Sequence, residues 1–409
     1  MTKNDYFYPH QYGFRSNHST EIALIELHNK LTSEIDNKKM SIGVFLDLTK
    51  AFDTVPHNIL LAKLERYGIR GIPLQWFSNY LSGRFQSLYF NDTMSEPLPV
   101  NIGVPQGSIL GPLLFLIFIN DFPNASNRLI FYLFADDTNL FASDFNLDNI
   151  ISLFNQELPK VSTWLLTNKL TLNVTKSNSI IFSIHHNHTN INEISLNNIV
   201  IPFSNSAKFL GIVFDNRLTF ITHINHIAVK VAKNLGLLNL IKQYIPFDVK
   251  KCLYYTMIYP YFNYGTIIWG SNYPTRLSQL IILQKKAIRF VLNLPFKSHV
   301  SHLFIVYKFL SISQIVKLKV LCFMHKHFHN MFPSIVNNYF NLSTSHYSSR
   351  TPYCYRIPHI RTNYAKFSIK YYGPFLWNQI PLDLKIINSL PMFKNKTKEY
   401  ILLNVIFNE

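Results

Sequence analysis

The stretch FYLFADDTNLFAS, residues 131–143, places two aspartates side by side within an apolar, aromatic run. Burying one unpaired carboxylate costs several kcal/mol, and a second one beside it adds mutual repulsion. The pattern predicts two strands joined by a two-residue turn, with Asp136 and Asp137 at the tip of the hairpin. Asp-Asp is also a common turn dipeptide, so the pair alone indicates no more than an ordinary turn.

A third aspartate, Asp47, lies at the end of SIGVFLDL, residues 41–48, which reads as a β-branched, apolar strand. Adjacent strands lie about 4.8 Å apart, so Asp47 can meet Asp136 and Asp137 at neighbouring strand ends. Three carboxylates there would repel one another unless divalent cations neutralise them. Two Mg²⁺ ions about 3.5–4 Å apart, held by carboxylates and substrate phosphates, are used for in-line phosphoryl transfer. The sequence therefore predicts a two-metal site at the three aspartates.

Charge and composition narrow the class of partner. The chain has 409 residues, 39 Lys and Arg against 22 Asp and Glu, and a formal net charge of +17. Such an excess indicates a polyanionic partner, and we expect nucleic acid rather than a membrane surface, because the sequence contains no basic amphipathic helix of the kind that binds membranes. The apolar runs are also too short or too interrupted to span a bilayer. Three separated cysteines form neither a zinc knuckle nor a disulfide framework, which suits an intracellular compartment, nuclear or cytoplasmic.

The texture of the sequence changes along the chain. Strand and helix patterns alternate up to about residue 221, and helical patterns dominate afterwards, including residues 223–244, 277–292 and 312–328. We expect an α+β domain over residues 1–225, a helical region over 226–335 and a loop-rich, basic region over 336–409. Nothing in the sequence indicates an oligomeric state.

Several motifs resemble one family closely. The runs FLDLTKAFDTVPHNILLAKLERYGI (45–69), GVPQGSILGPLLFLIFIND (103–121) and FADD (134–137) resemble the palm of reverse transcriptases from Jockey-type non-LTR retrotransposons. QYGFR (11–15), LTLNVTKSNSIIF (170–182) and KFLGIVFDNRLTFITHI (208–224) are similar to further motifs of these enzymes, in the same order. The resemblance implies a right-hand polymerase palm with partial fingers, followed by an all-helical thumb and a C-terminal region.

The resemblance also implies the chemistry. It predicts an RNA-directed DNA polymerase that uses two Mg²⁺ ions, with Mn²⁺ as an alternative, and copies an RNA template by adding deoxynucleoside triphosphates to a DNA primer 3′-hydroxyl. Asp47 and Asp136 would bridge the metals, Asp137 would hold the primer-side metal, and the carbonyl of Leu48 would complete a ligand shell.

Further residues are assigned to the nucleotide and the template. The turn amides of Lys50 and Ala51 would face the triphosphate, and Phe52 would press against C2′ of the sugar and exclude a 2′-hydroxyl; alternatively, Phe52 is an ordinary core aromatic. The resemblance places Gln106 and Gly107 against the nucleotide and Lys176 near the pyrophosphate; alternatively, Lys176 is an ordinary surface lysine. Arg15 and Arg84 are candidate template or phosphate contacts.

The sequence also departs from the family. A finger motif that usually precedes QYGFR is missing, as are an endonuclease, an RNase H and a zinc-knuckle region, so we expect an N-terminally truncated copy or one fragment of a longer reading frame. An incomplete fingers domain leaves a second hypothesis open. In it, the chain is a catalytically silent remnant that binds nucleic acid through its basic groove.

Overall fold

The computed structural model describes residues 6–184, 192–197, 199–343 and 353–404. The chain divides into two units, of which the first comprises residues 1–23 and 39–207 and the second residues 24–38 and 208–409. Helix α1 (Thr20–Asp36) starts in the first unit and continues in the second. Among the described residues, no helix combines the length and the apolarity needed to cross a membrane.

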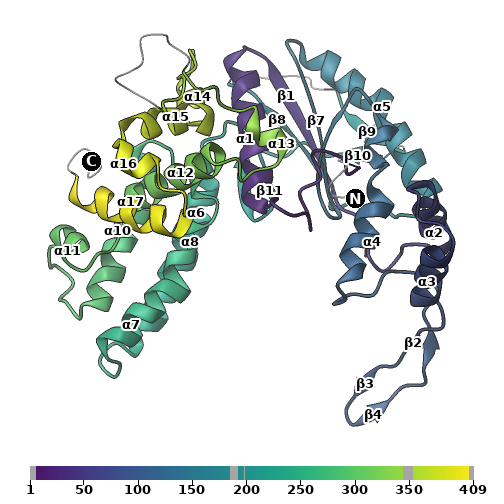
Figure 1. Ribbon diagram of the computed structural model, residues 1–409, viewed down its shortest axis with the longest axis horizontal. Helices are drawn as coiled ribbons and strands as arrows, with labels where there is room; N and C mark the ends of the chain where they lie inside the picture. Colours follow the sequence, from purple (N-terminus) through teal and green to yellow (C-terminus); the bar gives the residue numbers. More distant parts are fainter. Residues whose placement is uncertain (1–5, 185–191, 198, 344–352, 405–409) are drawn as a thin grey trace. The chain divides into compact units, whose positions relative to one another are not determined.

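The first unit is built on a four-stranded antiparallel sheet in the order β6-β7-β1-β8 (Figure 1). Central strand β1 is flanked by β7 and β8, so it is hydrogen-bonded on both edges, and six of its seven residues are buried. Its sequence, MSIGVFL, is correspondingly apolar except for Ser41, without polar alternation. The sheet consists of β1 (Met40–Leu46), β6 (Ile130–Phe134), β7 (Asp137–Asp144) and β8 (Asn178–Phe182).

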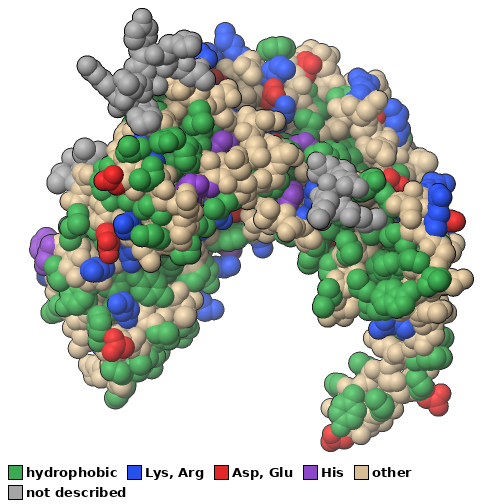
Figure 2. Space-filling model, viewed as in Figure 1, with side chains coloured by type: hydrophobic (Ala, Val, Ile, Leu, Met, Phe, Trp, Pro, Cys, Tyr) green, Lys and Arg blue, Asp and Glu red, His purple; other side chains and the backbone are tan. Residues whose placement is uncertain are grey.

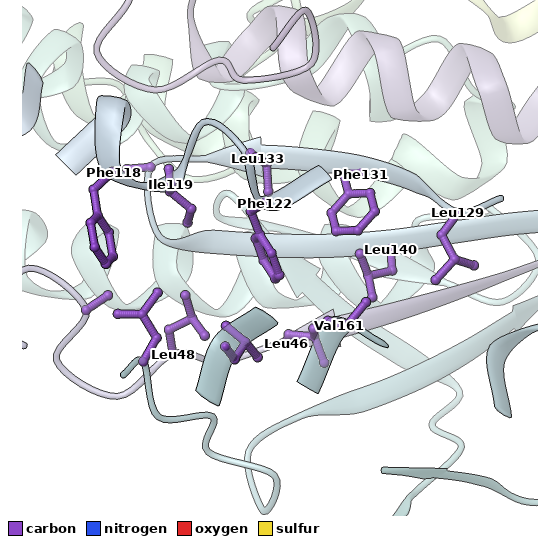
Figure 3. Packing of buried hydrophobic residues seen from close by; sticks show 14 of the residues in the cluster. Leu46, Leu48, Phe118, Ile119, Phe122, Leu129, Phe131, Leu133, Leu140 and Val161 are labelled. Carbon is purple, nitrogen blue, oxygen red and sulfur yellow. The ribbon is translucent and has the colours of Figure 1, made fainter. Parts of the chain in front are cut away.

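Helices α4 and α5 supply much of the core beside this sheet. The sequence of α4, LGPLLFLIFI, is apolar all round, and α5 buries residues at helical spacing, among them Phe154, Leu158 and Val161. Figure 3 shows side chains of β1, β6 and β7 packed with Phe118, Phe122 and Val161. The helices of this unit are α2 (His57–Arg66), α3 (Ile72–Leu81), α4 (Leu110–Ile119) and α5 (Leu147–Thr167), with a 3-10 turn over Phe122–Ala125.

A long hairpin follows α3, and all four of its short strands are exposed. It pairs β2 (Phe85–Gln86) with β5 (Leu98–Pro99) and β3 (Tyr89–Phe90) with β4 (Thr93–Met94), closing on the turn Asn91-Asp92. Figure 2 shows apolar side chains on it, at the lower right. A second small pair, β9 (Ile194–Leu196) with β10 (Ile199–Ile201), lies beside α5.

The second unit is mainly helical, as predicted from the sequence beyond residue 221. Besides residues 24–38, it contains the hairpin of β11 (Ser206–Phe209) and β12 (Ile212–Asp215), whose first two residues lie in the first unit. The helices that follow are α6 (Ile221–Leu240), α7 (Phe247–Leu253), a π-helical turn η3 (Tyr254–Ile258), α8 (Tyr259–Asn263), α9 (Thr266–Trp269), α10 (Pro274–Val291), α11 (Ser301–Val306), α12 (Ile312–Phe328) and α13 (Ser334–Asn337).

The prediction of a loop-rich region over 336–409 is wrong for much of the part that the structure describes. Four helices occur there: α14 (Asn363–Phe367), α15 (Ile369–Gln379), α16 (Leu382–Lys385) and α17 (Leu390–Leu403). Gly373-Pro374 reads as a break, yet α15 runs through it. Packing outweighs this local signal, because α12 contacts both α15 and α17, and Trp377 and Phe393 are fully buried.

Candidate active site

The three aspartates lie at one edge of the sheet. Strand β1 runs antiparallel to β7, and the last aligned pair, Leu46 with Thr138, brings the next residues, Asp47 and Asp137, to the same strand ends. Phe134 pairs with Asp137 across the β6–β7 hairpin. The two-residue turn is therefore Ala135-Asp136, and Asp137 is the first residue of β7 instead of a tip residue.

The carboxylates influence one another. Burial raises the pKa of Asp136 above its ordinary value, a backbone hydrogen bond opposes this, and the charge of Asp47 raises it further. Burial also raises the pKa of Asp137, and the charges of Asp136 and Asp47 add to the increase. The hairpin thus concentrates negative charge at a partly buried place, which a bound cation would relieve.

The donor set fits magnesium when the ion is shared with a substrate. Across the described ranges, no three His, Cys, Asp or Glu side chains converge as a ready ligand group for a metal ion. Mg²⁺ prefers oxygen ligands, and proteins usually bind it through one or two carboxylates together with substrate phosphates rather than in an all-protein cage. Open carboxylates at one strand edge match that mode of binding.

The loop that contains Lys176 is hydrogen-bonded to the backbone of Asp47. The Asp47 carbonyl accepts from the N–H of Asn173 at 2.8 Å, and the Asp47 N–H donates to Oγ of Ser177 at 3.3 Å. Leu48, whose side chain is buried, forms a β-bridge with Leu172. Exposed Lys176 lies in this loop, so its side chain originates close to the aspartate edge.

The predicted nucleotide-binding residues lie on two segments that are bonded together. Phe52 follows Lys50 and Ala51 in a turn, where the N–H of Asp53 donates to the Lys50 carbonyl at 2.9 Å. The N–H of Val104 donates to the Phe52 carbonyl at 2.8 Å, and Nε2 of Gln106 donates to Oδ1 of Asp53 at 2.6 Å. The structure thereby brings Phe52 and Gln106 together across 54 positions of sequence.

A hollow of about 740 Å³ opens beside this junction and is lined by Asp53, Arg84, Asn101 and Gln106, among others. Arg84 is exposed, and its guanidinium lies 5.5 Å from the ring of Tyr80. Gly107 has φ 77°, and a Cβ there would meet open space, so the turn leaves room for a close approach. The half-buried Phe52 ring stacks on Phe115 at 4.2 Å.

Arg15 is engaged with the backbone of its own segment. Its Nη1 donates to the carbonyls of Tyr8 at 2.9 Å and Gln11 at 3.1 Å, and its guanidinium lies 5.5 Å from the ring of Phe7. These bonds hold residues 8–15 as a closed loop. The contact with template or phosphate expected for Arg15 stays a prediction.

Three residues of this region were assigned no role from the sequence. Gln11 accepts a hydrogen bond from the N–H of Ala135 in the β6–β7 turn, Asp53 accepts one from Gln106, and the His57 ring is hydrogen-bonded through Nε2 to the Gly103 carbonyl at 2.7 Å. All three lie inside the motifs quoted above. A polar side chain within a run of motif residues was the available signal, but its partner could not be identified without the tertiary structure.

Known proteins share this sequence pattern. Residues 1–214 match the family model described as "Reverse transcriptase (RNA-dependent DNA polymerase)". The "Probable RNA-directed DNA polymerase from transposon X-element" of Drosophila melanogaster is 29% identical over 69% of this chain and 32% of its own length. The "RNA-directed DNA polymerase from mobile element jockey" of the same organism is 29% identical over 70% of this chain and 32% of its own length.

The chain spans about a third of the length of these curated relatives. Among solved structures, a telomerase from Candida albicans in complex with a telomeric RNA fragment aligns over 74% of this chain and 48% of its own, with 14% identity and a TM-score of 0.41. The family model matches 214 of the 409 residues and includes all three aspartates of the strand edge, so the protein belongs to the reverse transcriptase family.

Proposed function

We propose that this chain is the polymerase part of a non-LTR retrotransposon enzyme, and that it copies an RNA template into DNA from a primer 3′-hydroxyl. The observation that carries the proposal is the gathering of Asp47, Asp136 and Asp137 at one strand edge, where burial and mutual repulsion raise the pKa of the last two. In this proposal the four-stranded sheet belongs to the palm, with part of the fingers around it. The helices from α6 onwards form the thumb and the C-terminal region.

The three carboxylates would hold two Mg²⁺ ions, or Mn²⁺ in their place, with the Leu48 carbonyl as a further ligand. When bound, the ions make the primer hydroxyl more acidic and stabilise charge on the leaving pyrophosphate. Asp47 and Asp136 would bridge the ions, and Asp137 would position the one on the primer side. Lys176, on the loop bonded to Asp47, would neutralise or protonate the pyrophosphate.

The junction of Phe52 and Gln106 would bind the nucleotide. The amides of Lys50 and Ala51 would face the triphosphate, Gln106 would hydrogen-bond the sugar, and Gly107 would allow its close approach. Asp53 supports this assignment, because its bond to Nε2 fixes the Gln106 amide beside the hollow. Arg84, which lines the same hollow, would contact template or nucleotide phosphate.

Primer extension on an RNA template with Mg²⁺ tests the function. We expect Asp136→Ala to reduce extension thousands-fold, because losing the metal ligands removes several kcal/mol of barrier lowering. Binding of the RNA–DNA hybrid should stay nearly intact, since affinity for a polyanion depends mainly on lysines and arginines. The matched control is Asp92→Ala, which removes an exposed aspartate of another two-residue turn. Equal extension by Asp136→Ala and wild type would refute the proposal, and hybrid binding without wild-type extension would favour the silent remnant.

Phe52 would select deoxynucleotides by contact with C2′ of the sugar. Phe52→Ala should admit ribonucleotides and lower discrimination by about 10–200-fold, the range expected when a pocket contact is removed. Competition between dNTP and rNTP in single-nucleotide extension measures this ratio. Phe90→Ala is the control, because that ring is exposed on the long hairpin. Unchanged discrimination in Phe52→Ala, together with a loss of stability, would identify Phe52 as a core aromatic stacked on Phe115.

A further inference from the structure

Residues 10–12 pair in parallel with strand β6. Gln11 forms a parallel bridge with Leu133, the Tyr12 N–H donates to the Leu133 carbonyl at 2.8 Å, and the Leu133 N–H donates to the His10 carbonyl at 2.9 Å. This pairing brings a segment more than 120 positions away in sequence against the catalytic hairpin. The Gln11 side chain is only 2% exposed.

The Gln11 amide is hydrogen-bonded to both backbone groups of Ala135, the residue just before Asp136. Its Oε1 accepts from the Ala135 N–H at 3.0 Å and from the Gly13 N–H at 2.9 Å, and its Nε2 lies 3.5 Å from the Ala135 carbonyl oxygen. Gly13 completes the contact, since a Cβ there would lie 2.5 Å from the Ala135 nitrogen. Only a glycine lets the two backbones approach this closely.

Ala135 needs such support because of its own conformation. Its φ is 54°, in the left-handed region, which costs a residue with a Cβ roughly 1–2 kcal/mol. The orientation of this residue sets the direction in which the chain continues into Asp136. The hydrogen bonds to the N–H and to the carbonyl of Ala135 therefore restrain both peptide groups that flank its Cα, and the second of these groups leads directly into Asp136.

We infer that Gln11 is a positioning residue for the metal-binding edge: by fixing the Ala135 backbone it holds Asp136 in the geometry that divalent cations and the primer hydroxyl require. The inference rests on the proposed function for the identity of the reaction, but its first readout is independent of activity. Groups that orient metal ligands typically contribute about 10–100-fold to metal affinity or activity.

The test measures Mn²⁺ binding by the full chain, using electron paramagnetic resonance to count the free ion. Gln11→Met keeps the length of the side chain and removes its polar atoms, and we expect Mn²⁺ affinity to fall about 10–100-fold. The matched control is Asn168→Leu, which removes another buried amide of the same unit. The Asn168 amide donates to the Trp164 carbonyl at 2.8 Å, at the C-terminal end of α5. This control should lose comparable stability and keep wild-type Mn²⁺ affinity.

Gln11→Asn is the second variant, because it leaves an amide in the site that is one methylene too short to reach Ala135. It supports the inference if Mn²⁺ affinity falls as in Gln11→Met, and it applies equally if Gln11→Met does not fold. In extension assays, both variants should lower kcat and leave the KM for the nucleotide nearly unchanged. Wild-type Mn²⁺ affinity in a folded Gln11 variant would overturn the inference and leave the polymerase proposal standing.

The two proposals can fail separately. If wild-type protein binds Mn²⁺ through Asp136 but extends no primer, the polymerase proposal fails, while weaker binding by the Gln11 variants still supports the positioning role. If the wild-type protein binds no Mn²⁺, or if Asp136→Ala does not abolish the Mn²⁺ binding, both proposals are overturned.

Discussion

Two hairpins of the first unit close with two-residue turns of different chemistry. Between β3 and β4 the turn is Asn91-Asp92, with φ 47° and 56°, and both residues are exposed. Between β6 and β7 it is Ala135-Asp136, with φ 54° at an alanine that is 4% exposed. Asn and Asp adopt positive φ readily and are typical of such turns, whereas alanine is not.

The Asn91-Asp92 turn adopts its conformation through its own residues, whereas the Ala135-Asp136 turn is held by contacts with distant residues. The exposed turn is bonded locally, by the Tyr89 hydroxyl donating to Asp92 at 2.8 Å. The Ala135-Asp136 turn is hydrogen-bonded by Gln11 and closely approached by Gly13, both distant in sequence. The hairpin that carries Asp136 and Asp137 thus obtains its turn geometry from tertiary contacts, and this contrast can be tested.

The largest effect should follow from Gly13→Ala. The added Cβ would lie 2.5 Å from the Ala135 nitrogen, so the backbones must separate, which costs about 1–3 kcal/mol of stability. A displacement of about 1 Å at the reacting groups should reduce primer extension about 100-fold. Urea denaturation and extension assays measure the two effects.

Gly236→Ala is the control for this substitution. Gly236 lies exposed in α6, and a Cβ there meets nothing within 4 Å. Alanine should therefore stabilise the helix by about 0.5–1 kcal/mol. If Gly13→Ala lost no more stability or activity than Gly236→Ala, the Ala135-Asp136 turn would not depend on the close approach of residue 13.

The next effect concerns metal binding. Mg²⁺ at about 100 times its dissociation constant should stabilise the protein by about 2.7 kcal/mol, because it binds only the folded state. Asp137→Asn should abolish this increase in melting temperature, while Asp92→Asn at the exposed turn should keep it. Scanning calorimetry with and without Mg²⁺ gives the comparison, and equal stabilisation of both variants would place the ion elsewhere.

The smallest effect is expected when Ala135, at positive φ in the β6–β7 turn, is replaced by glycine, which adopts positive φ without cost. In wild type, Ala135→Gly should change stability by less than about 1 kcal/mol, since relief of strain is offset by a lost buried methyl group and a freer unfolded chain. In the Gln11→Met background it should restore about 1 kcal/mol. Denaturation of the four proteins measures this coupling, and a coupling near zero would show that Gln11 does not support Ala135. Asn91→Gly, the control, should be nearly neutral in both backgrounds.

The helices predicted from the sequence were correct where the hydrophobic pattern is periodic. The helix predicted at 312–328 occurs with those bounds, and α5 (Leu147–Thr167) extends the predicted 147–166 by one residue. The neighbouring ends of the strands that carry Asp47 and Asp137 were also predicted correctly. The turn was misplaced by one residue, because Asp-Asp is a better local turn signal than Ala-Asp, and α15 was missed because Gly373-Pro374 reads as a break.

The sequence alone determined the alternation of strands and helices in the first part of the chain, the helical character of the second, and the motif residues that define the family. Each depends on periodicity or on residues close together in the chain. Only the tertiary structure decided that Gln11 is hydrogen-bonded to the Ala135-Asp136 turn and that Asp53 is hydrogen-bonded to Gln106. These bonds join a side chain to a group 124 or 53 positions away, and such a bond leaves no pattern in the sequence because its partner is selected by how the segments pack.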